Sequence, residues 1–210
     1  MEMKNVIVID HPFVQDSLTH LRKKDTELQS WRHHSDKICE QLFSQAMRGL
    51  EFTYSTIETP LAKMEAPQLA DEIVVIPILR SGIAMLSGAM HLLPKSRIGF
   101  IGLERDEETA IADQYYWKLP PIHDNTVVIL TDPMLATGGS ILYSLRKIAA
   151  EKPKEIRVVS VIAAPEGILA IQAEFPDVKI YVGAIDDHLN ERAYIVPGLG
   201  DYGDRYFGTA

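Results

Sequence analysis

The chain has 210 residues, of which 46% are hydrophobic and 24% charged, a composition typical of a globular protein and not of a disordered or fibrous one. Folding of a chain this long buries about 70% of its unfolded surface, so the core needs neither disulfides nor a structural metal. A net charge of −8 and a pI near 5.4 exclude the basic surface of a general nucleic-acid binder. We expect a single domain spanning residues 1–210.

The first sixty residues are expected to form helices and then a strand that pack on this domain. Residues 16–24 and 31–47 have helical patterns, and "EFTYSTIET" (51–59) partly alternates as a strand does. Cys39 stands beside Ile38 and Leu42 at helix-face spacing, which indicates a buried thiol without a catalytic role. The start "MEMKNVIVIDHPF" does not resemble a secretion signal, and no apolar run reaches about 18 residues. We therefore expect a cytoplasmic protein without a membrane partner.

From residue 73 onward, short apolar runs alternate with helix-like segments. The runs are continuously apolar, which is typical of parallel strands that helices cover on both faces. They predict a three-layer α/β domain built on a parallel sheet of about five strands. The runs are "IVVIPI" (73–78), "RIGFIGL" (97–103), "TVVIL" (126–130), "IRVVSVIAA" (156–164) and "KIYVGA" (179–184).

Two segments interrupt or follow this alternation. Residues 104–118 are charged and then aromatic, and we expect them to form a hairpin or flap. Tyr115, Tyr116 and Trp117 in this segment are expected to pack in the hairpin or between subunits. The tail "IVPGLGDYGDRYFGTA" (195–210) is rich in glycine and has no regular pattern, which indicates more than packing.

Charged residues follow three of the predicted strands. They are Arg80, Arg105 and Asp132. Ligands of open α/β sheets bind beyond the carboxyl ends of the strands, so these side chains are candidates for one site. Arg105 has an alternative role, because it lies among acidic residues and could only balance charge on a solvated loop.

The segment "TDPMLATGGS" (131–140) has the features of an anion cradle. Thr137 to Ser140 stand where a helix begins, at the positive end of the helix dipole, and the glycines let an anion approach the backbone closely. Asp132 opens the loop, and a carboxylate there fits a ligand with hydroxyl groups or a bridging divalent cation. The pattern therefore indicates a sugar phosphate. It is neither a nucleotide P-loop nor a dinucleotide-binding turn.

Four stretches together resemble the signatures of the uracil phosphoribosyltransferases, in the same order. They are "VVIPILRSG" (74–82), "ILTDPMLATGGS" (129–140), "AAPEGI" (163–168) and "IVPGLGDYGDRYFGT" (195–209). The resemblance covers residues 70 to 210 well and "HPFVQDSLTHLR" more loosely. It implies the type I phosphoribosyltransferase fold, a three-layer parallel sheet with a flap and a C-terminal base-binding hood. Pro133 replaces the second acid of the broader pattern, as it does in the uracil branch.

The resemblance also implies a reaction, in which uracil and phosphoribosyl pyrophosphate (PRPP) give UMP and pyrophosphate. It implies catalytic roles for Arg80, Arg105 and Asp201. It places Mg²⁺ mainly on PRPP, near Asp201. The implied PRPP site comprises Arg80, Arg105, Asp132, Pro133, Met134, Leu135, Ala136, Thr137, Gly138, Gly139, Ser140 and Asp201.

For the base, the resemblance implies main-chain contacts from Ile195 and from Gly200, Asp201 and Tyr202. Backbone N–H and C=O groups complement the edge of uracil, whereas cytosine would set its amino group against a backbone donor. Tyr202 stands where a small residue is common, so it either narrows the base pocket or points away from it. A homodimer or larger homo-oligomer is expected, and GTP activates some members. The sequence of residues 30–50 departs from the family, which leaves both properties open.

Three other functions are compatible with parts of this pattern. A regulator that binds PRPP or UMP and controls RNA would need a basic stripe, which the acidic chain lacks. A silent relative would not need Asp132, Arg80 and Asp201, which are all present. A purine phosphoribosyltransferase is the nearest alternative within the enzymes, and the sequence of the tail argues against it.

Overall fold

The computed structural model describes residues 4–105 and 112–209, and its centre is a nine-stranded sheet. All strand pairs of the sheet are parallel except β6 and β7. Short strands β5 (Arg97–Ile98) and β9 (Met134–Leu135) pair with β4 and β10. The main order is β1 (Val6–Val8), β11 (Lys179–Ile185), β10 (Glu155–Ala163), β8 (Thr126–Thr131), β4 (Glu72–Leu79), β6 (Phe100–Arg105) and β7 (Ala112–Lys118).

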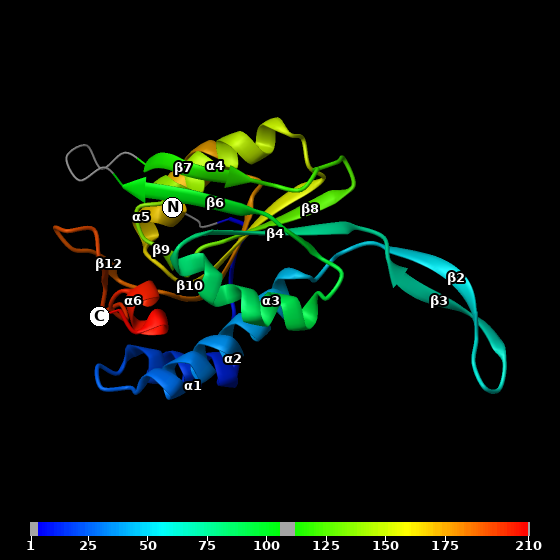
Figure 1. The fold of residues 1–210 in the computed structure, drawn as a ribbon, viewed down its shortest axis with the longest axis horizontal. Coiled ribbons are helices and arrows are strands. Elements are labelled where there is room, and N and C mark those ends of the chain that lie inside the picture. Colours follow the sequence, from blue (N-terminus) through cyan, green and yellow to red (C-terminus); the bar gives the residue numbers. More distant parts are fainter. Residues whose placement is uncertain (1–3, 106–111, 210) are drawn as a thin grey trace.

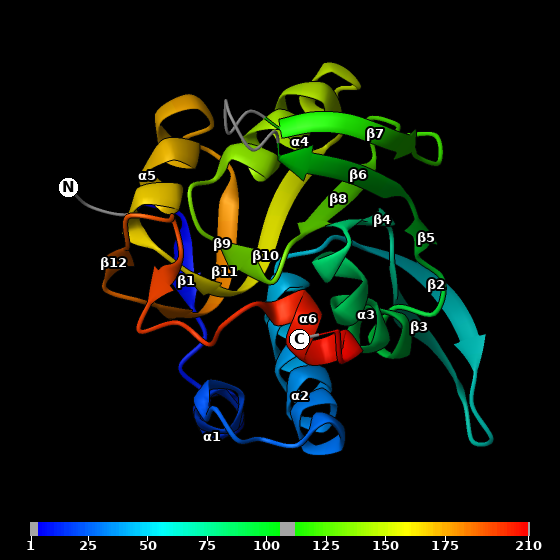
Figure 2. The same ribbon diagram turned by 60° about the vertical axis from the view of Figure 1, so that its left-hand side comes forward.

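Helices cover both faces of this sheet (Figures 1 and 2). One face carries α1 (Pro12–Arg22), α2 (Leu28–Ala46), the 3₁₀ turn η1 (Ser81–Met85), α3 (Leu86–Leu92) and α6 (Tyr202–Phe207). The other face carries α4 (Gly139–Ala150) and α5 (Pro165–Glu174). Successive residues of β8 point to opposite cores, Ile129 to the first and Leu130 to the second. The predicted three-layer α/β fold is therefore confirmed.

The sheet is wider than the five strands that the apolar runs predicted. Val6–Val8 adds β1 beside β11, although three residues are too few to give a recognisable pattern. At the other edge, β6 and β7 form an antiparallel hairpin, as expected for the segment of residues 104–118. The tip of that predicted flap, residues 106–111, lies outside the described residues.

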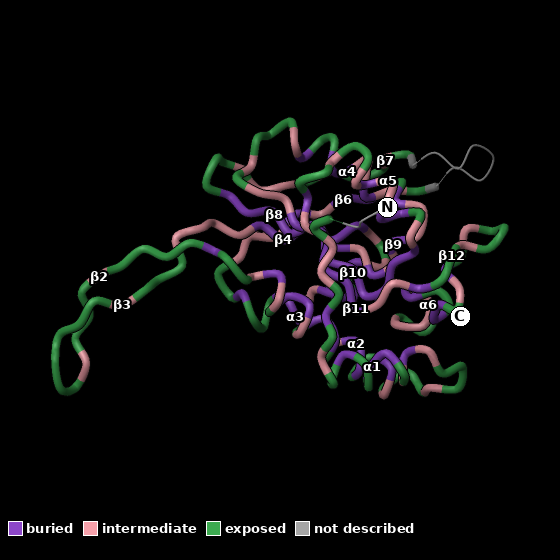
Figure 3. The backbone as a smooth tube through the Cα atoms, turned by 180° about the vertical axis from the view of Figure 1, so that it is seen from behind, coloured by how far each residue is buried: buried purple, intermediate pink, exposed green. Residues whose placement is uncertain are grey.

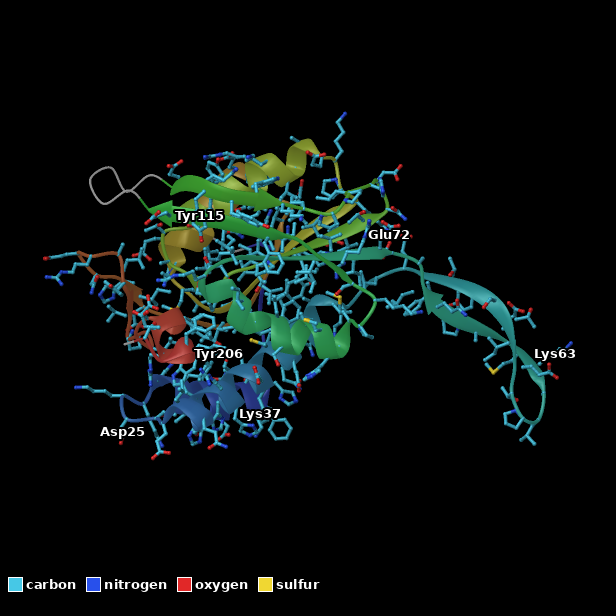
Figure 4. The ribbon with its side chains drawn as sticks, viewed as in Figure 1. Asp25, Lys37, Lys63, Glu72, Tyr115 and Tyr206 are labelled. Carbon is cyan, nitrogen blue, oxygen red and sulfur yellow. The ribbon has the colours of Figure 1, made fainter. Side chains whose placement is uncertain are left out.

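A two-stranded arm projects from the body (Figure 1). Its strands are β2 (Phe52–Glu58) and β3 (Lys63–Leu69), paired antiparallel. The predicted strand within residues 51–59 is confirmed, whereas β3 lacks a hydrophobic pattern and was not predicted. Figure 3 shows the arm exposed along most of its length, in contrast to the buried central strands. In Figure 4, Lys63 lies towards the far end of the arm and Glu72 where the arm joins the sheet.

The two N-terminal helices, α1 and α2, pack against the C-terminal segment that contains α6. Pro12 stands in the first turn of α1, where its missing N–H costs nothing. Trp31 on α2 is buried and packs edge-on against Tyr202 of α6, with ring centres 4.6 Å apart. Cys39 is buried as predicted, and burial raises the pKa of its thiol to about 12. None of the described helices is long and apolar enough to span a bilayer.

Candidate active site

A cleft of about 1090 Å³ lies beyond the carboxyl ends of β4, β6 and β8. It brings together four residues singled out from the sequence, namely Arg80, Asp132, Ser140 and Asp201. The other lining residues are Ile78, Leu79, Ser81, Ile83, Leu103, Glu104, Tyr115, Gly203, Asp204, Phe207 and Thr209. The cleft therefore lies where the sequence predicted a ligand site, beyond the carboxyl ends of the parallel strands.

Asp132 follows β8, and one oxygen of its carboxylate accepts two hydrogen bonds. The Ser81 hydroxyl donates to Oδ1 at 3.3 Å, and the Met134 backbone N–H donates to the same atom at 3.3 Å. Burial raises the pKa of Asp132 to about 6, even though these two hydrogen bonds and an open edge towards the cleft favour the charged form. The nearby Asp201 carboxylate adds to the rise in pKa. The carboxylate is thus fixed in position and ready to accept hydrogen bonds from a ligand.

Arg80 follows β4 and is exposed at the edge of the cleft. The peptide bond between Leu79 and Arg80 is cis. No residue in the described part of the chain forms a hydrogen bond or ion pair with its guanidinium group. Its charge is therefore available to an anionic ligand. Arg105 ends β6, but its side chain lies outside the described residues, so its predicted role stays a prediction.

The predicted anion cradle runs from β9 into α4. Gly138 caps α4 with φ of 81°, a left-handed conformation that favours glycine. Ala136 and Thr137 precede it, and the Gly139 N–H lies 3.4 Å from Thr137 Oγ1. The first N–H groups of a helix lack partners within it, and the helix dipole adds positive potential there. This geometry is compatible with the predicted anion cradle, whose binding role stays a prediction.

Gly167 on α5 supports this loop, a relationship that the sequence alone did not show. A Cβ atom at Gly167 would lie 2.3 Å from the Ala136 carbonyl oxygen, far inside contact distance. Likewise, a Cβ atom at Gly138 would lie 3.0 Å from the Gly167 carbonyl oxygen. The sequence signal for this contact was the glycine in "AAPEGI". It stands in the first turn of α5, where a glycine lowers helix stability unless the backbone must pack closely. The two glycines let α5 and the cradle pack backbone to backbone.

The predicted base segment lies around the start of α6. Ile195 belongs to β13 (Ile195–Val196), which pairs with β12 (His188–Leu189), and its side chain is buried. Gly200 has φ of 83°, and Asp201 caps α6 by accepting from the Asp204 N–H at 2.8 Å. Of Ile195, Gly200, Asp201 and Tyr202, only Asp201 lines the cleft.

The side chain of Tyr202 points away from the cleft. It is 1% exposed, and its phenol oxygen lies 2.6 Å from Ser35 Oγ on α2. Of the two orientations considered from the sequence, the structure therefore has the one in which Tyr202 packs into the core. Only its backbone remains available to a ligand.

An ion pair behind the base segment was also missed from the sequence. Arg22 at the end of α1 donates to both carboxylate oxygens of Asp186, at 2.8 and 2.5 Å. Arg22 also donates to the Gly198 carbonyl oxygen at 2.8 Å, while the Gly198 N–H donates to Asp186 at 2.8 Å. Both backbone groups of Gly198, which has φ of 65°, are thus held by one side-chain pair.

Comparisons with known proteins agree on one family. The family model described as uracil phosphoribosyltransferase matches residues 8–209. The uracil phosphoribosyltransferase of Malacoplasma penetrans is 46% identical over 202 residues, which cover 96% of this chain and 98% of that protein. The enzyme of that name from Legionella pneumophila strain Lens is 45% identical over 210 residues, covering 100% and 98%.

Solved structures extend the comparison to the fold. A protein from Aquifex aeolicus superposes with a TM-score of 0.92 at 35% identity, covering 98% of this chain and 99% of that one. A hypoxanthine-guanine phosphoribosyltransferase from Bacillus anthracis has a TM-score of 0.52 at 17% identity, covering 76% of this chain and 80% of that one. The second likeness concerns the fold alone.

Proposed function

The chain belongs to the uracil phosphoribosyltransferase family, a family of pentosyltransferases that form UMP from uracil and PRPP, and we propose that it does so in the cleft lined by Arg80, Asp132, Ser140 and Asp201. The observation that carries the proposal is the position of Asp132 between a helix N-terminus and a free arginine. This arrangement offers separate places for a phosphate, a hydroxylated sugar and a second anion.

In this proposal, PRPP spans the cleft. Its 5′-phosphate lies on the cradle of residues 136–140, which offers backbone N–H groups and the Ser140 hydroxyl. The ribose hydroxyls donate to the Asp132 carboxylate. The pyrophosphate faces Arg80, together with Arg105 from the hairpin. Pro133, Met134 and Leu135 shape the loop between Asp132 and the cradle.

The residues of the cleft suit a displacement at the anomeric carbon. The bond from that carbon to the pyrophosphate oxygen breaks, a bond to uracil N1 forms, and the N1 proton passes to the leaving pyrophosphate or to water. Positive charge develops on the ribose and negative charge on the leaving group. In this proposal Arg80 and Arg105 stabilise the leaving group, and the Asp132 carboxylate lies at the ribose, where the positive charge develops. No nucleophilic side chain is required.

The cleft also fits Mg²⁺ bound together with PRPP. The Asp132 and Asp201 carboxylates supply the oxygen donors that this cation prefers, and the repulsion between them favours a cation nearby. Asp201 is the residue that would approach the metal, whereas PRPP supplies most of the ligands. When bound, the metal neutralises charge on the leaving pyrophosphate.

For the base, we assign main-chain contacts to Ile195 and to Gly200 through Tyr202. Gly198 and Gly200 both have left-handed backbone conformations, and the pair of Arg22 and Asp186 fixes Gly198 in place. Cytosine would leave a buried donor unpaired, and such a mismatch costs about 10⁴ in specificity.

The arm supports the expected homodimer or larger assembly. Its two strands and the turn between them contact little else and expose large apolar side chains, namely Phe52, Tyr54, Ile57, Leu61, Met64 and Leu69. An apolar surface of this kind is typical of an interface. Light scattering of the full chain tests it, and a monomer at all concentrations would contradict it. A buried, free cysteine fits a cytoplasmic location.

The experiment that tests the function is an end-point assay with PRPP, Mg²⁺ and each of uracil, cytosine, hypoxanthine and adenine, with and without GTP. Nucleotide and pyrophosphate are measured together. We expect UMP from uracil alone. Another nucleotide would favour a purine enzyme, and PRPP binding without turnover would favour a regulator. The arms with GTP test activation, which the sequence leaves open.

A further inference from the structure

A cluster of possible metal ligands lies between α1 and α2, apart from the cleft. Asp16 and His20 come from α1, and His34 comes from α2. Their ligand atoms all lie within 4.8 Å of one another. None of the three lines the cleft or belongs to the residues assigned above to PRPP or uracil. We propose that Asp16, His20 and His34 form a binding site for a divalent transition metal of the Zn²⁺ class.

The first pair of ligands is set by the helical repeat. Residues four apart lie on the same face of a helix, so Asp16 and His20 are neighbours on α1. His20 Nε2 lies 4.0 Å from Asp16 Oδ1. The His20 ring stacks on that of His34, with centres 3.9 Å apart and planes within 7°. Two imidazoles and one carboxylate thus meet where the two helices pack.

A buried hydroxyl prepares His34 as a ligand. Its Nδ1 lies 3.2 Å from Ser17 Oγ, and both residues are buried. With the proton on Nδ1 and donated to Ser17, the lone pair of Nε2 is free to bind a metal. A hydrogen bond to the second ring nitrogen is the usual support of a metal-binding histidine.

A bound ion requires only a local adjustment. Bonds of 2.0–2.1 Å in a tetrahedral site separate ligand atoms by about 3.4 Å, so the widest pair must approach by roughly 1.4 Å. The side chains of Asp16 and His20 are 65% and 36% exposed and can turn. The stacked rings would then splay so that both lone pairs meet one ion. Three protein ligands leave a fourth position for water.

The donor set determines which ion binds. Imidazole nitrogens suit Zn²⁺, Co²⁺ and Ni²⁺, whereas Mg²⁺ requires oxygen ligands in an octahedral arrangement. The site therefore differs from the proposed Mg²⁺ position in the cleft. Its location also suggests what it does. His20 lies two residues before Arg22, which donates a hydrogen bond to Gly198. An ion that joins α1 to α2 would therefore stabilise the helices that support the base segment.

The test is a titration of the purified, chelator-treated full chain with Co²⁺. We expect visible absorption of a four-coordinate Co²⁺ that saturates at one ion per chain and is displaced by Zn²⁺ but not by excess Mg²⁺. Zn²⁺ should also raise the melting temperature. These readouts need neither substrate nor turnover, so they are independent of the proposed reaction.

Two variants and one control make the test specific. His20→Gln and Asp16→Asn should weaken Co²⁺ binding by about tenfold or more and abolish the Zn²⁺-dependent rise in melting temperature. His91→Gln is the matched control, because His91 lies 3.7 Å from Glu40 in another exposed His and carboxylate pair. It should bind Co²⁺ as the unaltered chain does. Absence of a saturable spectrum, or a spectrum that survives in His20→Gln, would overturn the proposal.

Discussion

Arg22 and Asp186, which are 164 residues apart in the chain, form an ion pair with two hydrogen bonds that also holds both backbone groups of Gly198. The Asp186 side chain is almost fully buried, at 3% exposed. A buried carboxylate that loses its partner is costly, because nothing replaces the lost charge and hydrogen bonds. The pair therefore links the stability of α1 to the position of the base segment.

Arg22→Gln should lower the free energy of unfolding by about 3–5 kcal/mol. It should also raise the KM for uracil more than that for PRPP, because Gly198 lies in the base segment and not in the cradle. Urea unfolding and steady-state kinetics measure the two effects. Arg22→Lys restores one charge and should recover part of both.

The control for this prediction is Arg146→Gln. Arg146 also forms two hydrogen bonds to a carboxylate, that of Glu174, at 2.7 Å each, but both side chains are exposed. Exposed ion pairs contribute little to stability, so this variant should be nearly neutral. Equal effects of the two substitutions would show that burial of Asp186 does not determine the result.

Asp132→Asn should abolish PRPP binding and yet stabilise the protein at neutral pH. Folding raises the pKa of Asp132 from 3.8 to about 6. Between pH 3.8 and about pH 6, the carboxyl group is therefore protonated in the folded state and ionised in the unfolded state. The contribution of this group to stability therefore falls as pH rises through that window. Asparagine removes the charge, with a gain of about 1–3 kcal/mol above pH 6.

The pH dependence distinguishes this explanation from a general effect of the substitution. At pH 4 most of the gain should disappear, because Asp132 is then protonated in the folded chain. Urea unfolding at pH 4 and pH 7 measures the difference, and calorimetry with PRPP measures binding. In the unaltered chain, PRPP affinity should fall below about pH 6. A variant that gains no stability at pH 7 would contradict the raised pKa of Asp132. A variant that still binds PRPP would remove Asp132 from the PRPP site.

Most of the cleft could be predicted from the sequence because its parts are local. Asp132 and Ser140 stand in one loop, and Arg80 directly follows an apolar run. The parallel sheet then brings the ends of neighbouring strands to one edge. The continuous apolar runs likewise predicted the three layers, since both faces of each strand had to be covered.

The remaining features depend on contacts between distant segments. The partner of Arg22 is set by how α1 docks on β11, and no periodicity encodes it. His20 and His34 do not have the spacing of a metal motif, yet two packed helices bring them together. Only the first strand of the arm, β2, was predicted. The second strand, β3, pairs with β2 but buries almost none of its side chains, so it needs no apolar pattern.

Gly167→Ala should disturb the cradle without touching the ligand. Alanine is more favourable than glycine in a helix by about 1 kcal/mol, so the substitution would stabilise the protein if there were space for the new Cβ atom. Here the new Cβ would lie 2.3 Å from the Ala136 carbonyl oxygen, and α5 or the cradle must move. We expect a loss of about 1–3 kcal/mol and a higher KM for PRPP. Glu174→Ala, at the exposed end of the same helix, is the control and should leave the KM for PRPP unchanged.

Tyr202→Phe tests whether the tyrosine acts in the core or in the base pocket. The hydroxyl forms a buried hydrogen bond with Ser35, and phenylalanine removes that bond while keeping the ring against Trp31. The expected loss of stability is about 1–2 kcal/mol. Since the side chain points away from the cleft, the ratio of kcat/KM for uracil to that for 5-fluorouracil should not change. Tyr202→Ala should cost about 3–5 kcal/mol through the cavity it leaves, again with the same ratio if the protein folds. A changed ratio in Tyr202→Phe would mean that the phenol reaches the base.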